Sequence, residues 1–482
     1  MPIIISDHLD PDVDFYVPPG TDATQAFQEA ILLSKVYGVA HLLVRGRLYI
    51  YASDLLPITL EPSLHFIIEG DGLGEIIYVN TSNNGNIPPV FITGTVYSLI
   101  EMQTVTSNGA LMPTSIMEVS TFGWIVAFKN MRLVNLTSQQ WFMVSGQNNN
   151  NIMLTSFYFD SVQFFANIQL LYTGLVIFTN CYSNGSQLYL STMSRDVVIM
   201  ASRFEDTTLT SVSEHGWTIV GSVFVGLAQV NITGSNGSII GCVFDGASLS
   251  GQNTQNVKIV ASQFQNVSFF VNVKVSFTQG SGYSIVANNF VGYSLVLSLG
   301  QSSWAVVGFN TFIYSANLVV LAQDGTLVEN VSIIGNNFGT GPFHNSFIFV
   351  SGWSPQGEPQ LTGTINVLYI AFNNFTNSAK PPPYNIVLGY RVSSKLIVHG
   401  IAYINIAISV VTVFISFNYF ANNNGLISNG TKMVIGYMSL QQLNSNVQLI
   451  TNLIITFNVN ENNTAYLPSG QTYTAQFNVG IT

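Results

Sequence analysis

The chain has 482 residues, of which only 7% are Asp, Glu, Lys or Arg, and its formal net charge is −10. A soluble globular protein carries about 25% charged residues, so uncharged amides and hydroxyls, including 47 Asn, must cover much of this surface. The acidic balance argues against a nucleic-acid-binding surface, because phosphate contacts require clustered Lys and Arg.

The first 50 residues are predicted to form an N-terminal arm, a helix and the first strands. Asp22-Ala-Thr-Gln25 has the capping-box pattern of a helix start, and the predicted helix runs toward Gly38. Phe27, Ala30 and Ile31 form its apolar stripe. The residues before the helix contain no basic segment followed by an apolar core, so no secretory signal peptide is expected.

A phrase of nine or ten residues recurs along the chain and is the main evidence for the fold. In each copy, apolar residues alternate with other residues, a small residue and a polar residue follow, and an aromatic residue ends the phrase. An example is Asn330-Val-Ser-Ile-Ile-Gly-Asn-Asn-Phe338. Clear copies end at Phe204, Phe224, Phe244, Phe264, Phe290, Phe312, Phe338, Phe375 and Phe420. Weaker copies end at Met131, Phe159, Cys181 and Asn460.

Each phrase predicts two short strands joined by a corner. The alternation turns one face of each strand inward, the corner Asn is expected to adopt the left-handed conformation, and the terminal anchor Phe points inward again. Stacked copies would add one strand to each parallel sheet about every 4.8 Å. The predicted fold class is therefore all-β: a single right-handed parallel β-helix of about 13 coils, capped by the N-terminal helix. The alternative, a large antiparallel sandwich, would not require a repeated phrase.

The predicted solenoid occupies residues 51–465, and a C-terminal tail or cap follows at 466–482. The anchors are 20 to 28 residues apart as far as Phe338, and the next spacings are 37, 45 and 40, so expanded loops are expected at about 339–400. An uncharged stretch from Ile401 to Ala421 contains two Asn and many β-branched residues, which favours buried strands over a membrane span.

The N-terminal region carries a family resemblance. Asp14-Phe-Tyr-Val-Pro-Pro-Gly-Thr-Asp-Ala-Thr-Gln-Ala-Phe-Gln-Glu-Ala-Ile31 and Ile67-Ile-Glu-Gly-Asp-Gly-Leu-Gly74 resemble the opening of pectate-lyase-like β-helix proteins, which include viral tailspikes, depolymerases and secreted glycan-active proteins. Two catalytic signatures that the resemblance implies are missing: the Asp cluster with an Arg base of pectate lyases, and the Asn-Thr-Asp, Asp-pair and Gly-His-Gly set of polygalacturonase-like hydrolases. The isolated carboxylates of tailspike glycosidases form no short motif, so a hydrolase or lyase stays open.

Three carboxylates are the candidate catalytic residues. Asp160, Glu205 and Asp245 each follow a predicted anchor by one residue and should project from one column. Glu205 and Asp245 would lie about 9.6 Å apart, close to the roughly 6.5–9.5 Å that inverting glycosidases use. Surface ion pairs of Glu205 with Arg195 or Arg203 are the favoured interpretation. The sequence carries no metal or cofactor motif, so neither is predicted.

The region of expanded loops is a second candidate site. Aromatic faces with a few polar donors suit sugar recognition, and neighbouring predicted coils here supply His344, Trp353, Tyr384, Tyr390 and Arg391. The alternative is that these aromatic residues only stabilise the long loops and do not bind a sugar. Sequons that permit N-glycosylation occur at Asn80, Asn135, Asn184, Asn231, Asn236, Asn266, Asn330, Asn374, Asn429 and Asn462.

The missing catalytic phrases favour a non-enzymatic protein. We predict an extracellular or virion-surface structural protein of the viral spike or fibre type, which attaches to host glycans or to other virion proteins as a homo-oligomer or in a larger assembly. A tailspike-like polysaccharide hydrolase or lyase is the alternative. Packing in an assembly, glycosylation or the hot acidic medium of a thermoacidophile would each explain the few charges.

Overall fold

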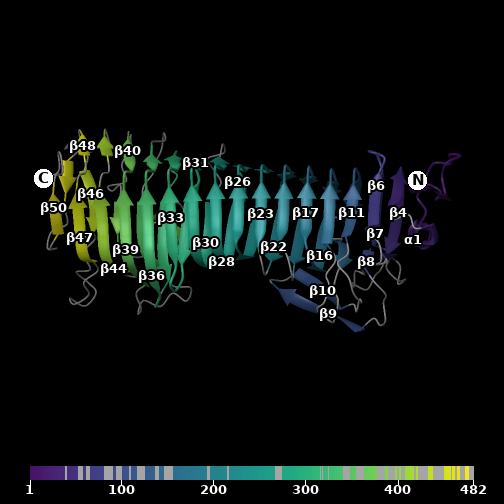
Figure 1. The fold of residues 1–482 in the computed structure, drawn as a ribbon, viewed down its shortest axis with the longest axis horizontal. Helices are drawn as coiled ribbons and strands as arrows, with labels where there is room; N and C mark the ends of the chain where they lie inside the picture. Colours follow the sequence, from purple (N-terminus) through teal and green to yellow (C-terminus); the bar gives the residue numbers. More distant parts are fainter. Residues whose placement is uncertain are drawn as a thin grey trace. The chain divides into compact units, whose positions relative to one another are not determined.

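The computed structural model describes residues 1–37, 41–52, 66–80, 125–135, 156–192, 196–213, 216–265 and 274–339, except 315, 317 and 324, together with shorter strands elsewhere. The chain divides into two compact units, Met1–Ile232 (unit 1) and Thr233–Thr482 (unit 2). Each unit is a parallel β-solenoid, in which successive coils add parallel strands to long sheets (Figure 1). The predicted fold class is confirmed.

The described strands of unit 1 lie on three faces. The first face contains β1 (Ile3–Ser6), β3 (His41–Arg45), β6 (Phe66–Gly70), β11 (Ile125–Lys129), β14 (Ser156–Asp160), β17 (Val176–Thr179), β20 (Val197–Met200) and β23 (Trp217–Val220). The second face contains β4 (Arg47–Ala52), β7 (Glu75–Asn80), β12 (Arg132–Asn135), β15 (Gln163–Phe165), β18 (Tyr182–Asn184), β21 (Arg203–Glu205) and β24 (Val223–Val225). The third face contains β5 (Ile58–Leu60), β8 (Phe91–Thr93), β13 (Trp141–Ser145), β16 (Asn167–Thr173), β19 (Gln187–Thr192) and β22 (Thr208–Ser213). Outside these faces, β2 (Phe15–Tyr16) pairs with β1, and β9 (Ile100–Ser107) pairs antiparallel with β10 (Ala110–Ile116).

The strands of unit 2 follow the same plan, and β25 (Gln229–Ser235) spans the boundary in the sequence. The first face contains β26 (Gly237–Ile240), the ends of β28 (Ser248–Val260) and β30 (Lys274–Val286), β33 (Trp304–Gly308), β36 (Leu327–Ile334), β39 (Gly363–Ala371), β44 (Ile408–Ser416), β47 (Ile450–Thr456) and β50 (Tyr473–Gln476). The second face contains β27 (Val243–Asp245), β29 (Gln263–Gln265), β31 (Asn289–Val291), β34 (Thr311–Ile313), β37 (Asn337–Phe338), β40 (Asn374–Thr376), β45 (Tyr419–Ala421) and β48 (Val459–Glu461). The third face contains the starts of β28 and β30 with β32 (Ser294–Leu299), β35 (Leu318–Gln323), β38 (Ile348–Trp353), β41 (Ile386–Leu388), β46 (Lys432–Tyr437) and β49 (Thr464–Tyr466). A short antiparallel pair joins β42 (Ile397–Val398) to β43 (Ile401–Ala402).

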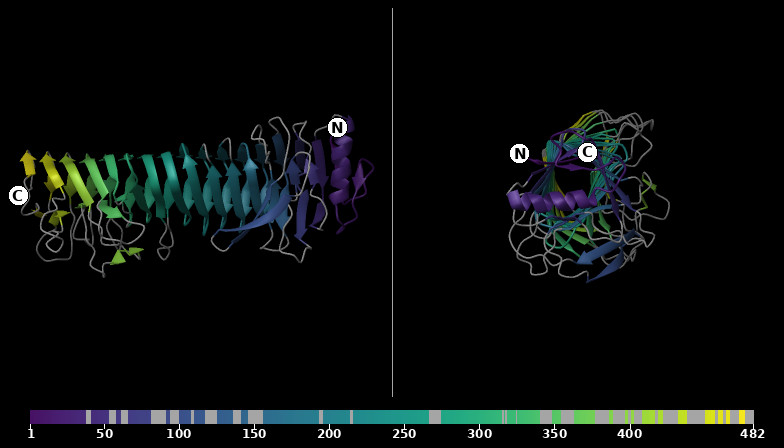
Figure 2. Two further views of the ribbon diagram at one scale, coloured as in Figure 1. Left: turned by 90° about the horizontal axis from the view of Figure 1, so that it is seen from below. Right: turned by 90° about the vertical axis from the view of Figure 1, so that its right-hand side faces the viewer.

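The N-terminal helix forms as predicted and covers one end of unit 1. Helix α1 (Thr24–Tyr37) lies across that end in the right-hand view of Figure 2. Its predicted stripe, Phe27, Ala30 and Ile31, is buried. The carboxylate of Asp22 accepts the backbone N–H of Thr24 at 3.1 Å, which satisfies one of the free donors at the helix start.

The number of coils differs from the prediction. In the described part of the chain the second face has seven strands in unit 1 and eight in unit 2, fifteen in all rather than thirteen. The two additional strands, β4 and β7, precede the first repeat that the sequence reveals, at Met131. The region predicted as expanded loops also contains strands, β38 to β42, and the predicted tail contains β50.

Stacked phenylalanines form the core beneath the second face. In unit 2 the rings of Phe244, Phe264, Phe290, Phe312 and Phe338 stack nearly parallel, with centroids 4.8 to 4.9 Å apart. This separation equals the spacing of hydrogen-bonded strands, so each coil adds one ring. The strand register continues the column through Phe375, Phe420 and Asn460, as predicted.

Three of the weaker repeats were read in the wrong register. Phe159 belongs to the first face, where its ring stacks on Phe128 at 5.3 Å and Phe178 at 5.0 Å. Met131 and Cys181 lie at the corner between the first two faces rather than in the anchor column. Inward-facing residues of both faces are apolar, so the alternation alone did not distinguish them.

The corner agrees with the prediction in part. Asn130 (φ 50°) and Asn180 (φ 53°) have the predicted left-handed backbone, whereas in unit 2 the left-handed residue is the one before the Asn, as at Ala287 (φ 58°), Phe309 (φ 55°) and Phe372 (φ 57°). The following residue is buried and bonds to both neighbouring coils: the Asn310 carboxamide accepts the backbone N–H of Asn288 in the preceding coil at 2.9 Å and donates to Oδ1 of Asn336 in the next coil at 3.0 Å. Asn is used here because its amide can both donate and accept along the stack.

Candidate functional site

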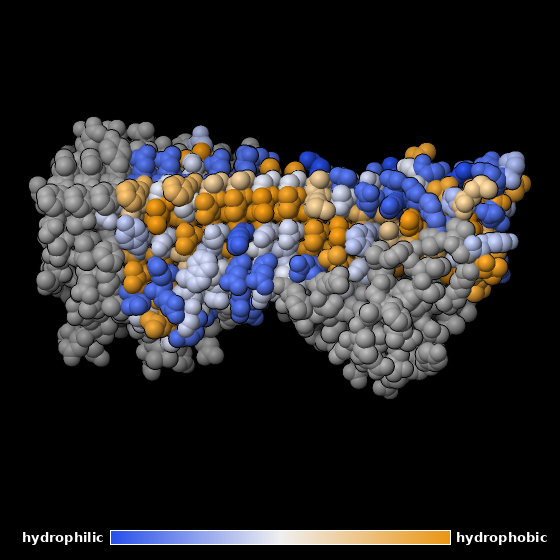
Figure 3. Space-filling view, in the orientation of Figure 1, coloured by the Kyte–Doolittle hydropathy of each residue, from blue (hydrophilic) through white to orange (hydrophobic). Residues whose placement is uncertain are grey.

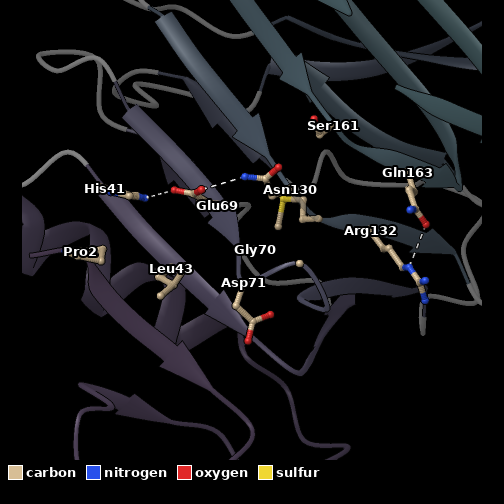
Figure 4. Close-up of a pocket in the computed structure, with 12 residues that line it drawn as sticks. Pro2, His41, Leu43, Glu69, Gly70, Asp71, Asn130, Arg132, Ser161 and Gln163 are labelled. Atoms are coloured by element: carbon tan, nitrogen blue, oxygen red, sulfur yellow. Dashed lines mark hydrogen bonds and ion pairs between the residues drawn. The ribbon is translucent and has the colours of Figure 1, made fainter. Parts of the chain in front are cut away.

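A pocket of about 600 Å³ lies on the corner between the first and second faces of unit 1 (Figure 4). Four consecutive coils contribute to it, through β3, the turn after β6, the turn before β12, and the turn before β15. Its polar lining consists of His41, Glu69, Asp71, Asn130, Arg132, Ser161 and Gln163. Gly70 is required at this point, because a Cβ atom there would lie 2.5 Å from the carbonyl oxygen of Asn130 in the next coil.

Glu69 is the centre of one wall of the pocket. Its Oε2 lies 2.9 Å from Nε2 of His41, and its Oε1 accepts a hydrogen bond from Nδ2 of Asn130 at 3.0 Å (Figure 4). The three residues come from three successive coils, so the carboxylate ties these coils together at the surface. The Glu69 side chain is 29% exposed, which leaves it within reach of a ligand.

Arg132 forms the opposite wall and is held at both ends of its guanidinium. Nε donates to Oε1 of Gln163 at 3.0 Å, and a terminal nitrogen donates to Oε1 of Glu75 at 3.1 Å. The buried Glu75 also pairs with Arg47 at 3.0 Å, so two guanidiniums share one carboxylate. The cluster therefore keeps one positive charge that its own carboxylate does not neutralise, and Arg132 is 41% exposed.

These side chains begin a longer polar column on the outside of the second face. The strand register places Arg47, Glu75, Arg132, Gln163, Tyr182 and Arg203 on successive coils. Six coils at about 4.8 Å each make a row about 24 Å long from first to last residue. Phe165, 39% exposed, packs edge-on against Tyr182 beside this column, with ring centroids 6.1 Å apart. The column thus combines charged, amide and aromatic groups on one rigid surface.

Glu205 lies beside the far end of the polar column and is fully engaged. Arg203 donates to its Oε1 at 2.6 Å, and the hydroxyl of Tyr182 donates to its Oε2 at 2.9 Å. The hydrogen bond from Arg203, followed by that from Tyr182, lowers the pKa of the Glu205 carboxyl. The ion pair between Arg203 and Glu205 is present, whereas Arg195 falls outside the described residues.

The structure does not place the three candidate catalytic carboxylates in one column. Asp160 ends β14 on the first face, opposite Thr179, whereas Glu205 ends β21 on the second face of the same unit. The error follows from the misread anchor at Phe159. Asp245 ends β27 on the second face of unit 2, opposite Gln265.

The predicted glycan-binding residues are mostly outside the described part of the chain. Trp353 is the last residue of β38, opposite Gln323, and so belongs to a strand rather than to an inserted loop. His344, Tyr384, Tyr390 and Arg391 lie outside the described residues.

The predicted glycosylation sites lie in several environments. Asn184, Asn236 and Asn330 are exposed, and Asn231 and Asn374 are partly buried. Asn80 and Asn135 end strands β7 and β12. The remaining sequons, at Asn266, Asn429 and Asn462, lie outside the described residues.

The residues that line the pocket were not predicted from the sequence to form a site. Glu69 and Asp71 were present in the Gly-rich segment that carries the family resemblance, which was the available signal. His41, Asn130 and Gln163 could not be joined to them without the strand register, because they are separated by tens of residues.

The described residues contain neither a metal-binding group nor a membrane-spanning helix. No group of three or more His, Cys, Asp or Glu side chains is placed there to hold a metal ion. No helix among those residues is long and apolar enough to cross a membrane. Cys181 and Cys242 are both buried and form no disulfide, and burial raises the pKa of the Cys181 thiol to about 12.

No protein-family model and no curated protein matches the chain. Among solved structures, tailspike protein 3 of bacteriophage CBA120 is 13% identical, with 78% of this chain and 63% of the tailspike covered and a TM-score of 0.38. A mutant tailspike protein of E. coli bacteriophage HK620 in complex with a pentasaccharide is 11% identical, with 100% and 80% covered and a TM-score of 0.43. PfbA, a surface adhesin of Streptococcus pneumoniae, is 14% identical, with 96% and 90% covered and a TM-score of 0.30. The chain spans less than two thirds of the CBA120 tailspike, and similarities this weak carry no information about its function.

Proposed function

We propose that the chain is an extracellular or virion-surface protein of the spike or fibre type, and that it attaches to glycans through unit 1. The pocket supports this proposal. It brings a carboxylate, an imidazole, carboxamides and a guanidinium from four coils to one concave surface. Sugar hydroxyls both donate and accept hydrogen bonds, and planar side chains of these types can satisfy both roles.

The rigidity of the scaffold supports the same function. Each pocket residue lies in a strand or in the short turn between two strands, and its position is fixed by the parallel register. A site that is already ordered loses little conformational entropy when it binds. The polar column extends the surface beyond the pocket, so a glycan of several residues could remain in contact along the axis.

The direct test is glycan binding by the full chain and by a Glu69→Gln variant. The substitution keeps the shape of the side chain but removes the charge that His41 and Asn130 contact. Charge-assisted hydrogen bonds contribute about 1.5–3 kcal/mol, so we expect binding on a glycan array to weaken by at least tenfold. Glu29→Gln is the matched control, because this exposed carboxylate of helix α1 also accepts a hydrogen bond from an amide but does not line the pocket. Equal binding by both variants would contradict the assignment of the pocket.

A polysaccharide hydrolase or lyase is the second candidate function. The observation in its favour is that two carboxylates, Glu69 and Asp71, line the same pocket. Release of reducing ends or unsaturated products from a bound polysaccharide, lost in Asp71→Asn but with binding retained, would support an enzyme. We expect no such release, and we expect Glu205→Gln and Asp245→Asn also to leave the activity of the protein unchanged.

The region after Phe338 remains a proposed second attachment site. This proposal depends on Trp353 and Tyr384, because one stacked aromatic residue can supply most of the binding energy of a sugar site. The double variant Trp353→Ala with Tyr384→Ala should then weaken attachment to cells or glycans and leave assembly intact. If only the Glu69→Gln variant loses attachment, the pocket alone accounts for binding.

A further inference from the structure

A row of uncharged amides and one indole runs along the first face of unit 2. Asn236, Asn256, Gly282, Trp304 and Asn330 occupy successive coils in the parallel register. Asn236 precedes β26 and Trp304 begins β33, whereas the other three lie within β28, β30 and β36. Asn236, Asn256 and Asn330 are exposed, and Trp304 is 40% exposed. We name these five positions the amide–indole row. None of them carries a charge.

The backbone holds the first half of the row in place. Asn236 (φ 56°), Asn256 (φ 52°) and Gly282 (φ 78°) all have left-handed backbone, which Asn and Gly tolerate best. Nδ2 of Asn256 donates to Oδ1 of Asn236 at 3.2 Å, so the two amides are already oriented along the axis.

Gly282 allows its two neighbours in the row to approach each other. A Cβ atom at this position would lie 2.8 Å from Oδ1 of Asn256 and 3.3 Å from Cε2 of Trp304, and Gly282 itself is buried beneath them. The amide and the indole therefore converge over a residue without a side chain. On the other side of the indole, Asn330 lies directly opposite Trp304 in the parallel register.

The geometry points to a binding site for a neutral sugar, in which Trp304 is the stacking platform and the amides of Asn256 and Asn330 bond its hydroxyls. An exposed aromatic face binds the apolar C–H face of a sugar ring, and amides can donate to and accept from hydroxyls. The nearest charged side chains in the sequence, Lys258 and Glu329, are opposite in sign. The row therefore has no net charge that would select an acidic ligand.

The opposite ends of the same strands carry apolar side chains instead of amides. Ile240, Val260 and Val286 form an apolar column there, which continues through Gly308 to Ile334. Figure 3 shows a hydrophobic band along part of the described surface. Ile240 is 42% exposed, about as much as Trp304, but it has no amide neighbours in its column. It is therefore a matched control for exposure without the proposed chemistry.

The sugar could come from two sources. A free polysaccharide could lie along the row, or the protein's own N-glycan could occupy it, because Asn236 and Asn330 each begin a sequon. The hydroxyl of Ser332 donates to Oδ1 of Asn330 at 3.2 Å, so the sequon side chains already contact each other. Both sources present the same chemistry to Trp304. The inference rests on the proposed function only in treating the chain as a glycan-contacting protein.

The first experiment is affinity electrophoresis of the unglycosylated full chain in gels that contain dextran, a mannan or a galactan. We expect at least one neutral polysaccharide to retard the protein, Trp304→Ala to weaken the retardation about tenfold, and Ile240→Ala to leave it unchanged. Retardation that survives Trp304→Ala would overturn the inference. The pocket is tested separately by Glu69→Gln, so failure of one site does not imply failure of the other.

The second experiment addresses an attached glycan. In protein from a glycosylating host, a glycan on Asn330 should slow oxidation of Trp304 by N-bromosuccinimide, measured by peptide mass spectrometry. Ser332→Ala, which removes the sequon and keeps the Asn330 amide, should restore the oxidation rate. If no polysaccharide retards the protein and oxidation is equally fast with and without the glycan, Trp304 is not a sugar platform.

Discussion

The corners of unit 1 and those of unit 2 from Asn288 onward have the same left-handed backbone but are closed by different side chains. In unit 1 the hydroxyls of Ser202 and Ser222 each accept one backbone N–H from the preceding coil, at 3.1 and 3.2 Å. In unit 2, Ser262 still accepts the backbone N–H of Cys242 in this way, at 3.2 Å. Farther along, the carboxamides of Asn310 and Asn336 accept a backbone N–H and a side-chain N–H, and also donate to both neighbouring coils. The backbone geometry of the corner is therefore independent of the residue type. The number of hydrogen bonds between coils, in contrast, depends on which side chain closes the corner.

Replacing one carboxamide of unit 2 should have the largest effect. Asn310→Ala removes four side-chain hydrogen bonds and leaves their partners in Asn288, Asn336 and Ile285 buried without them. Each unsatisfied buried group costs about 1–3 kcal/mol, so we expect a loss of about 5 kcal/mol in the free energy of unfolding. Ser222→Ala in unit 1 should lose only about 1–2 kcal/mol on the same basis. Denaturant titration measures both values, and equal losses would mean that the two corners do not differ energetically.

Truncation of a phenylalanine in the core column should lower the free energy of unfolding by a similar amount in the two units. Phe224 and Phe244 are fully buried, and each belongs to a second-face strand. Truncation of a buried Phe costs about 3–5 kcal/mol, and we expect this loss for both Phe224→Ala and Phe244→Ala. Val243→Ala, on the outer side of β27, should cost less than about 1 kcal/mol. A loss below about 1 kcal/mol for Phe244→Ala would contradict its place in the core.

The repeated Phe was enough to predict the solenoid because each ring stacks on the equivalent ring of the next coil. The column from Phe204 onward was assigned correctly for this reason. Phe159 was misassigned because the first face also buries Phe, here between Phe128 and Phe178. Local alternation reports that a residue points inward but not which face it belongs to.

The site was harder to predict than the fold. Glu69 contacts His41, 28 positions earlier, and Asn130, 61 positions later, so its partners depend on how much chain each coil contains. The stretch of sequence from 81 to 124 contains no copy of the repeat, so the pairing of β6 with β11 across it was not available from the sequence. The corner Asn has the predicted left-handed conformation at Asn130 and Asn180 but not at Asn288, Asn310 and Asn336, because preference for left-handed backbone competes with preference for a buried, bonded amide.

Phe309 offers a smaller test of the corner in unit 2. It has left-handed backbone and is 68% exposed, whereas the equivalent residues of the neighbouring coils are Ala287 and Gly335. A bulky residue in this conformation is strained by about 1–2 kcal/mol, and Gly relieves the strain but adds entropy to the unfolded chain. Its ring also covers Gly335, where a Cβ atom would lie 2.8 Å from it. We therefore expect Phe309→Gly to change the free energy of unfolding by less than about 1 kcal/mol. Phe312→Ala, three residues later and buried, is the control and should cost about 3–5 kcal/mol.

The smallest expected effect concerns the charged outer surface of unit 1, at Glu205. Its pKa is lowered in the folded protein by Arg203 and Tyr182, so the folded state binds the proton less readily than the unfolded state. The resulting stabilisation is complete above the pKa of the unfolded carboxyl, about 4.3, and disappears as the pH falls through the lower folded pKa. We expect Glu205→Gln to lower the melting temperature slightly at pH 7 and not at all in strong acid, where the native carboxyl is also protonated. Tyr182→Phe, which keeps the Arg203 ion pair and removes one hydrogen bond, should give a smaller shift with the same pH dependence. A difference between native protein and Glu205→Gln that is the same at every pH would mean that the carboxylate contributes through packing rather than through its charge.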